Sequence, residues 1–395
     1  MYEALRTPRA KAKATGGLAE HTPVALLALL FDELRKRTGL DPEQVQDVVI
    51  GAARQHGDQG SNLARVAALM AGWVSVPGTT VSRACASGLE AINVAAARVT
   101  SGDAGLVVSG GVESLSRVPM LSENGPLWTD PVVRATVGSV HMGVAADLVA
   151  TLEGFDREEL DAFGVRTQTR AAAAQAAGRF DRSLVAVPGA DGSQVCAVDE
   201  HVRPGTTIAQ LAALEPAFAA LGADGQDAVA RARYPQLGQI RHLHTRGTSP
   251  SLADGAGVVL VGNAAGAARL DAAPRARIIG TAVAAVDPVV MLTAGQEATV
   301  AVIERAGLRV EDVDRFEFAE AFSALCLRFQ RDLHVPDERF NVNGGTIAIG
   351  HAFGATGPFL VTNLLDELDR CGGRYGVAAV SGAGGIGVAT LLERV

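Results

Sequence analysis

The chain has 395 residues, of which 48% are hydrophobic and 20% charged, and its formal net charge is −8. This length is enough for two or three domains' worth of core, and the acidic balance argues against a nucleic-acid-binding protein, which needs a basic surface. The four cysteines lie far apart without a Cys-x-x-Cys pair, and no apolar run approaches the ~18 residues of a membrane-spanning helix, so we expect a cytoplasmic protein with no disulfides, no bound metal and no membrane partner.

The first part of the chain, residues 1–118, alternates helical and strand-like segments. Apolar residues at helical spacing predict helices over 23–37 and 62–72, and short apolar runs predict buried strands at 47–51 and 106–111. Strands separated by helices predict a parallel sheet covered on both faces.

Within this part, the segment 81–97 has a β-branched start, a turn of small residues that holds Cys85, and an alanine-rich apolar run. The pattern predicts a strand, a tight turn and a helix, with Cys85 at the helix N-terminus, where backbone N–H groups and the helix dipole favour a thiolate. A thiolate is a strong nucleophile for acyl groups. The alternative is a buried cysteine that acts only as a small apolar residue.

The middle of the chain, residues 119–250, has few strand-like runs. An alanine-rich segment predicts one clear helix over 158–178, ended by Gly178. The stretch 223–246 is polar and rich in arginine. We expect the whole span to lie over the sheet domain and not to form a second sheet.

From residue 251 the alternating pattern returns and repeats the first part. Residues 37–50 align with 305–318 at a shift of 268 positions, and Ser87-Gly88 aligns with Thr356-Gly357 at a shift of 269. The repeat predicts a duplicated α/β unit that residues 119–250 interrupt. The turn at Cys85 and the turn at His351 would then lie in pseudo-symmetric places, where a nucleophile and a base can meet.

Ten short motifs follow one another along the chain: Arg6-Thr-Pro, Gln59-Gly-Ser-Asn62-Leu-Ala-Arg65, Cys85-Ala-Ser-Gly88-Leu, Gly110-Gly-Val-Glu113-Ser, His141-Met142-Gly, Thr206-Thr, Asp254-Gly-Ala, Glu320-Ala-Phe322, Asn343-Gly344-Gly345 and Gly350-His351. In these motifs and in their order, the chain resembles the thiolase family over essentially its whole length. The degradative 3-ketoacyl-CoA thiolases are similar in the longer segment before Thr245.

The resemblance implies a five-layered α-β-α-β-α fold, with two duplicated halves at 1–118 and 251–395 and a coenzyme A-binding loop domain at 119–250. It implies acyl transfer between Cys85 and coenzyme A, in 3-ketoacyl-CoA thiolysis or acetyl-CoA condensation. Acyl-CoA would be the substrate, with no permanently bound cofactor, and the protein would be a homodimer or a homotetramer.

The resemblance also assigns roles to residues. Cys85 is the nucleophile, His351 activates it, and Ser381 occupies the position of the family's acid/base. The oxyanion hole falls to Cys85, His351 and Ala383, and the substrate and coenzyme A side to His141, Met142, Ser249 and Ser251. Glu320 has a structural role beneath the site. The arginines of the loop domain are either solvated or a cluster for the nucleotide phosphates: Arg231, Arg233, Arg241 and Arg246.

The chain differs from the family pattern at several positions that the resemblance assigns to the active site. Ser381 stands where the family has a second cysteine, and the loss of a positioned acid/base group costs ~10²–10⁴-fold in rate. Ala319 replaces an Asn or His, and the loss of one oxyanion donor costs roughly 3–4 kcal/mol. Smaller changes are Ala383 for Gly, Ala352 for the proline after His351, which would loosen that turn, and Pro250 for a serine that faces the cofactor.

Three functions stay open on the sequence. The first is a thiolase-type acyltransferase with altered or reduced activity. The second is a thiolase-like protein that binds acyl-CoA, or pairs with another subunit, with little Claisen activity. The third, a ketoacyl-carrier-protein synthase type of enzyme, is disfavoured because such enzymes use further His or Asn donors and position 319 is alanine. Several histidines receive no role: His21, His56, His201, His242, His244 and His334.

Overall fold

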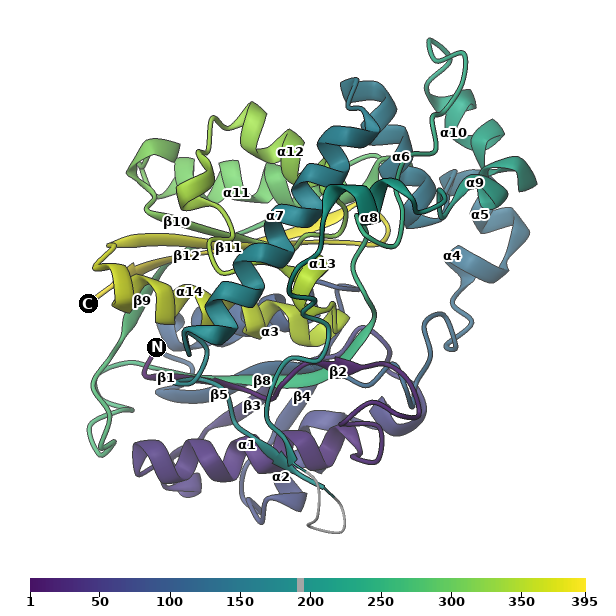
Figure 1. Cartoon of the computed structure of the whole chain (residues 1–395). Coiled ribbons are helices and arrows are strands. Elements are labelled where there is room, and N and C mark those ends of the chain that lie inside the picture. The colour runs from purple at the N-terminus through teal and green to yellow at the C-terminus, as the bar shows by residue number, and fades with distance from the viewer. Residues whose placement is uncertain (190–194) are drawn as a thin grey trace.

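Two large sheets and three layers of helices build the protein, and β6 (Val187–Pro188) and β7 (Val195–Cys196) of the middle span form a separate two-stranded sheet. The structure is a computed structural model that describes residues 1–189 and 195–395. Its layers stack in the order α-β-α-β-α (Figure 1). The five-layered fold expected from the resemblance is confirmed.

The first sheet consists of β1 (Glu3–Arg6), β2 (Ala10–Lys11), β3 (Asp47–Gly51), β4 (Gly78–Val81), β5 (Leu106–Glu113) and β8 (Ala253–Gly262). Its order is β1-β8-β5-β3-β4, with β2 paired to β8. Strands β5, β3 and β4 are parallel, but β8 runs antiparallel to both β5 and β1. The parallel arrangement predicted for residues 1–118 is therefore confirmed for the strands predicted there, β3, β4 and β5. Strand β8 comes from the second part of the chain and runs the opposite way, because an apolar run shows that a strand is buried and not which way it runs.

The second sheet consists of β9 (Ala276–Ala285), β10 (Arg315–Phe318), β11 (Tyr375–Gly382) and β12 (Ile386–Arg394). Its order, β9-β12-β11-β10, repeats the order β1-β8-β5-β3, and the strand directions repeat as well. The predicted duplication is thus visible in the topology. The halves also interlock, because β8 follows the predicted boundary at 250/251 and yet belongs to the first sheet.

Two helices form the layer between the sheets, and others cover the outer faces. The central helices are α3 (Ser87–Ser101) and α14 (Phe353–Cys371), which pack against each other and against both sheets (Figure 1). The outer helices are α1 (Pro23–Thr38) and α2 (Leu63–Met70) on the first sheet, and α11 (Ala294–Arg305) and α12 (Ser323–Asp332) on the second. Since α14 is enclosed by both sheets, most of its residues are buried.

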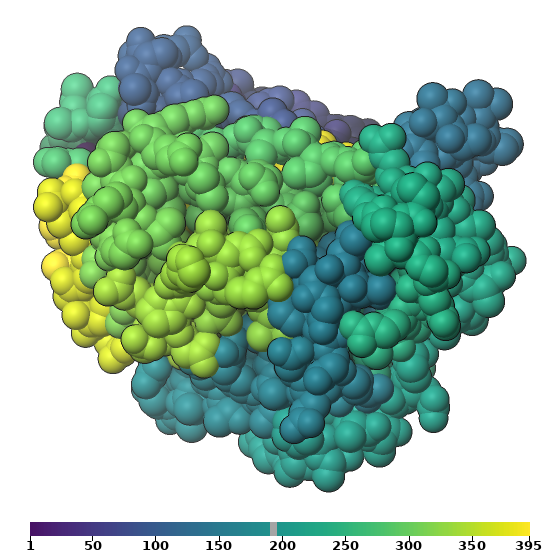
Figure 2. Space-filling model, turned by 90° about the horizontal axis from the view of Figure 1, so that it is seen from above, coloured from purple at the N-terminus to yellow at the C-terminus, as the bar shows by residue number. Residues whose placement is uncertain are grey.

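The span 119–250 lies along one side of the molecule, in blue and teal beside the green and yellow second half (Figure 2). Its longest helix begins with a capping box between Asp156 and Glu159, and the chain leaves the helix at Gly178, whose φ of 65° is left-handed. The elements of this span are α4 (Pro126–Thr129), α5 (Pro131–Val137), α6 (Met142–Glu153), α7 (Arg157–Ala176), β6 (Val187–Pro188), β7 (Val195–Cys196), α8 (Ile208–Ala212), α9 (Ala219–Leu221), the π-helical turn η3 (Gly222–Gln226) and α10 (Asp227–Arg233).

One segment, Pro131–Glu153, has the length and apolarity of a membrane-spanning helix. Its backbone turns at Gly138, with a φ of 72°, so α5 and α6 are separate helices. Helix α6 buries Val144 and Leu148 in the core of the second half, which accounts for its apolar composition.

Candidate active site

The central helices α3 and α14 approach each other closely near their N-terminal ends. A Cβ atom at Gly88 or at Gly111 would lie 2.1 Å from the carbonyl oxygen of Gly354, so this approach requires glycine at both positions. Cys85 lies just before α3 and His351 just before α14. The crossing of the two helices therefore brings the predicted nucleophile and base to one place.

A cavity of about 170 Å³ lies at this crossing, and Cys85, His351 and Ser381 all line it. His141 and Met142 line it from the loop domain, as the resemblance implies. Most of the remaining wall is apolar and comes from Met120, Phe218, Leu252, Leu292, Phe322 and Phe353. The cavity is thus a mostly dry pocket with a few polar groups, a form typical of small-molecule sites.

Cys85 is half-buried and lies in a strained turn, because Ala84 before it has a φ of 49°. Burial raises the pKa of Cys85 to about 12, although Arg54 and the backbone N–H groups of Cys85 and Ala383 lower it. The helix N-terminus was expected to favour a thiolate, but burial outweighs it and the resting residue is a thiol. The glycine-rich turn is close by, since a Cβ at Gly382 would lie 3.5 Å from the Cys85 nitrogen.

His351 is buried and held from three sides. Its Nδ1 lies 2.8 Å from the Thr356 hydroxyl, its N–H donates to the Ser251 carbonyl at 2.8 Å, and its carbonyl accepts from Ala253. Burial, and then the charge of Arg9, lower the pKa of His351 to about 3, so the ring is neutral. With Nδ1 donating to Thr356, Nε2 carries the lone pair that can take the Cys85 proton. The backbone bonds to 251–253 hold this turn in place with alanine at 352.

A buried carboxylate, Glu113 at the end of β5, ties together the loops around the site. One of its oxygens accepts from the N–H groups of Ala53 and Gly354, both at 2.9 Å, and the other accepts from the Arg54 N–H and the Gln59 amide. Gly354 belongs to the first turn of α14. Glu113 therefore fixes the start of the His351 helix against the loop after β3.

Ser381 lines the cavity, but its hydroxyl is already committed. It donates to the Leu292 carbonyl at 2.7 Å and accepts from the Gly295 N–H at 2.9 Å. The side chain is also tightly enclosed, since a Cβ at Gly295 would lie 2.6 Å from the Ser381 oxygen. The hydroxyl proton points at a backbone carbonyl and not at the pocket.

On the substrate side, His141 caps α6 by accepting from the Gly143 N–H through Nδ1 at 3.1 Å. Burial lowers the pKa of His141, so the ring is neutral and Nε2 carries the proton. The backbone N–H of His141 donates to Gln226 at 2.5 Å, and its ring lies 5.6 Å from that of Phe218. His141 therefore presents a hydrogen-bond donor within the cavity.

The two predicted coenzyme A-side serines lie in different places. Ser249 lines the cavity, and its buried hydroxyl makes no hydrogen bond within residues 1–189 and 195–395. Ser251 lines a separate small pocket with Arg246. Ala319 packs in the core between the sheets, and Ala321 lines the cavity in its stead.

The arginines of the loop domain make separate contacts. Arg231 donates to the Gly238 carbonyl, Arg241 donates to the Phe155 carbonyl, and Arg233 pairs with Asp287. Glu320 is structural, as expected: its carboxylate accepts hydrogen bonds from Thr167, Asn341 and the Ile347 N–H.

Comparison with known proteins identifies the family. Family models for the thiolase N-terminal domain and the thiolase C-terminal domain match residues 1–224 and 272–394. The chain belongs to the thiolase family. This thiolase is 37% identical over 404 residues to a 3-ketoacyl-CoA thiolase of Colwellia psychrerythraea, covering 100% of this chain and 99% of the relative.

Two further comparisons agree with this assignment. A 3-oxoadipyl-CoA/3-oxo-5,6-dehydrosuberyl-CoA thiolase of Escherichia coli is 35% identical, covering 100% of this chain and 98% of the relative. The crystal structure of the Bacillus anthracis acetyl-CoA acetyltransferase superposes with a TM-score of 0.85 at 32% identity, covering 100% and 98% of the two chains. The protein is thus a thiolase-type acyltransferase.

Some residues of the site received no role from the sequence. Thr356 orients His351, Gln226 holds His141, and Phe218 and Phe322 form the pocket wall. The repeat aligned Thr356 with Ser87 at the start of the other central helix, which was a usable signal for Thr356. Gln226 and Phe218 reach the site only through the path of the loop domain, which shows no periodic pattern.

Proposed function

We propose that this thiolase readily transfers acyl groups between Cys85 and coenzyme A but forms or cleaves carbon–carbon bonds slowly. The observation that carries the proposal is the Ser381 hydroxyl, which is held by two backbone hydrogen bonds at the position of the family's acid/base. Acyl transfer needs a base for the Cys85 proton, and the pocket provides one in His351. The carbon–carbon (Claisen) step also needs a group that exchanges a proton with a substrate carbon, and Ser381 does not provide it.

Acyl transfer needs one base, one nucleophile and one oxyanion site. His351 Nε2 takes the Cys85 proton as the sulfur attacks the thioester carbonyl. The bond between that carbon and the coenzyme A sulfur then breaks, and the leaving sulfur receives the proton from His351. The N–H groups of Cys85 and Ala383, which already point at the Cys85 sulfur, face the developing oxyanion.

Cleavage of a 3-ketoacyl thioester has a further demand. Attack of Cys85 on the 3-keto carbon breaks the C2–C3 bond and releases the enolate of acetyl-CoA, whose C2 must receive a proton. The reverse reaction removes a proton from the same carbon. Ser381 directs its proton to Leu292, and His141 is a neutral donor and hence a weak acid. We therefore expect the carbon–carbon step to be slower by ~10²–10⁴-fold than with a positioned acid/base.

We assign acyl-CoA binding to the loop domain, 119–250. The Ser249 hydroxyl on the cavity wall has no hydrogen-bond partner in the described part of the chain, and this supports the assignment, because a buried polar group without a partner is costly and a bound amide would supply one. His141 and Met142 of the same domain also line the cavity and support it.

The test compares two reactions of one enzyme preparation. The first is exchange of the acetyl group between acetyl-CoA and isotopically labelled coenzyme A, which requires no carbon–carbon step. The second is thiolysis of acetoacetyl-CoA. We expect exchange to exceed thiolysis by at least ~100-fold. Thiolysis as fast as exchange would overturn the proposal, and absence of both would favour a binding protein.

We also propose an oligomeric state and a cellular location. We propose a homodimer or homotetramer, supported by the half-exposed edge strand β4 of the first sheet, and size-exclusion chromatography with light scattering tests it. We propose a cytoplasmic location, supported by four free cysteines, and cell fractionation tests it.

A further inference from the structure

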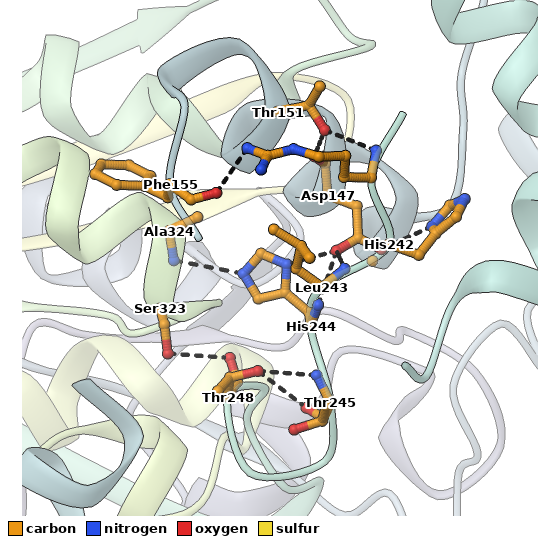
Figure 3. A network of polar contacts seen from close by, with 12 residues as sticks. Asp147, Thr151, Phe155, His242, Leu243, His244, Thr245, Thr248, Ser323 and Ala324 are labelled. Carbon is orange, nitrogen blue, oxygen red and sulfur yellow. Dashed lines mark hydrogen bonds and ion pairs between the residues drawn. The ribbon is translucent and has the colours of Figure 1, made fainter. Parts of the chain in front are cut away.

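A network of polar contacts in the loop domain joins Asp147 to His242 and His244 (Figure 3). Asp147 of α6 is fully buried, and one of its oxygens accepts from the Leu243 N–H, the His244 N–H and His244 Nδ1 at 2.8–3.0 Å. Its other oxygen lies 2.9 Å from His242 Nδ1. The second ring nitrogen of His242 lies 3.1 Å from Asp227, the first residue of α10.

The partners of the two rings differ in a way that sets their charge. His244 faces an acceptor on Nδ1 and the Ala324 N–H donor on Nε2, which suits a neutral ring. His242 faces carboxylate oxygens on both nitrogens, and only an imidazolium can donate to both. The geometry therefore calls for a positive charge on His242, a residue that received no role in the sequence analysis.

The α10 end of this network connects directly to the pocket. Asp227 follows Gln226, whose side-chain oxygen accepts from the His141 backbone N–H. His141 begins α6 and lines the cavity. A continuous path of contacts thus runs from His242 through Asp227 and Gln226 to His141.

We propose that His242 is a positioning residue, whose protonated ring clamps α10 to α6 between Asp227 and Asp147 and thereby holds Gln226 on His141. When the ring loses its proton it can donate to one carboxylate only. Asp147 is fully buried and cannot be solvated, whereas the side chain of Asp227 is 25% exposed. The contact with Asp227 is therefore the one that opens, and acyl-CoA binding weakens.

The sign of the pH dependence follows from the charged groups around His242. Asp147 faces it from α6 and Asp227 from α10, while on its own segment Arg241 donates to Phe155 and His244 bonds to Asp147. The hydrogen bond that His242 donates to Asp147, opposed by burial and supported by Asp227, raises the pKa of His242 above its ordinary value. A raised pKa means that the clamp is complete at low pH and is lost as the pH rises through that pKa.

The test follows hydrogen exchange of the full-length protein, with protection factors for residues 222–233 at about pH 6 and about pH 9. We expect protection to fall about tenfold or more at the higher pH, the loss of one charge-assisted hydrogen bond. Asp227→Asn keeps a partner for either ring form, because its amide both accepts and donates, so protection should become independent of pH. Asp224→Asn, at an exposed position of η3 outside the network, is the matched control. Its hydrogen-exchange protection should fall with rising pH as much as in the wild type.

The kinetic readout rests on the proposed acyl transfer. The acetyl-CoA concentration for half-maximal acylation of Cys85 should rise about tenfold from about pH 6 to about pH 9 in the wild type and stay constant in Asp227→Asn, with the maximal rate unchanged in both. The inference would be overturned if the hydrogen-exchange protection of residues 222–233 did not depend on pH in the wild type. It would also be overturned if protection in Asp227→Asn fell with pH as much as in the wild type. Absence of acylation would instead count against the proposed function. The hydrogen-exchange measurement would still decide the role of His242.

Discussion

The substitution Ser381→Cys tests whether the pocket lacks only a working acid/base group at position 381. A thiol at this position restores an acid/base group that can ionise, and a positioned group of this kind contributes ~10²–10⁴-fold. The larger sulfur replaces a hydroxyl that fits between the Leu292 carbonyl and the Gly295 N–H, at a cost in stability of ~1–3 kcal/mol. Because Gly295 leaves no room on its side, the sulfur is displaced toward the cavity. We expect thiolysis of acetoacetyl-CoA to rise ~100-fold or more, with acetyl exchange unchanged within a few-fold.

The assay follows both reactions in the wild type, Ser381→Cys and Ser381→Ala. The alanine variant is the matched control, because it removes the hydroxyl and adds no acid. It should leave thiolysis unchanged within a few-fold while lowering stability by ~1–3 kcal/mol, since the Gly295 N–H and the Leu292 carbonyl lose their partner. A ~100-fold loss of thiolysis in Ser381→Ala, with exchange intact, would refute the reasoning and make Ser381 a working acid/base.

Three further predictions concern the other site residues. His351→Ala should slow acetylation of Cys85 by ~10²–10⁴-fold in a rapid-quench assay while coenzyme A binding by calorimetry persists, and unchanged acetylation would remove His351 from the role of base. Glu113→Gln places an amide N–H₂ where backbone N–H donors converge, so we expect the free energy of unfolding to fall by ~2–6 kcal/mol and the melting temperature in calorimetry to fall with it. An unaltered melting temperature would contradict this prediction. The pKa of Cys85 is raised to about 12 and that of His351 is lowered to about 3, so the thiol and the neutral imidazole coexist at every pH between these values. The maximal acetylation rate should therefore not change from about pH 6 to about pH 9. A rate that rises tenfold per pH unit would instead indicate attack by a free thiolate.

Much of the fold follows from local patterns in the chain. Apolar spacing predicted the helix at 23–37, observed as Pro23–Thr38. Alanine-rich composition and the closing Gly178 predicted the helix at 158–178, observed as Arg157–Ala176. The internal repeat predicted that Cys85 and His351 would meet, and both line one cavity. These predictions succeed because periodicity and duplication are properties of short segments and of their spacing.

The remaining features depend on contacts between segments far apart in the sequence. The direction of β8 is set by its partners β1 and β5, which a run of apolar residues does not reveal. Cys85 packs against the core between the two sheets, to which both halves of the chain contribute, so a helix N-terminus alone gave the wrong resting state. The partners of Ser381 lie about 90 residues earlier in the chain, at Leu292 and Gly295, and no motif connects them.

The most direct test of the account is the mass of the intact protein after incubation with acetyl-CoA. We expect one acetyl adduct on the wild type, absent from Cys85→Ala and removed by added coenzyme A. That result would establish Cys85 as a nucleophile whose acyl group returns to coenzyme A. A wild-type protein that binds acetyl-CoA and gains no adduct, or an adduct that persists in Cys85→Ala, would contradict the account.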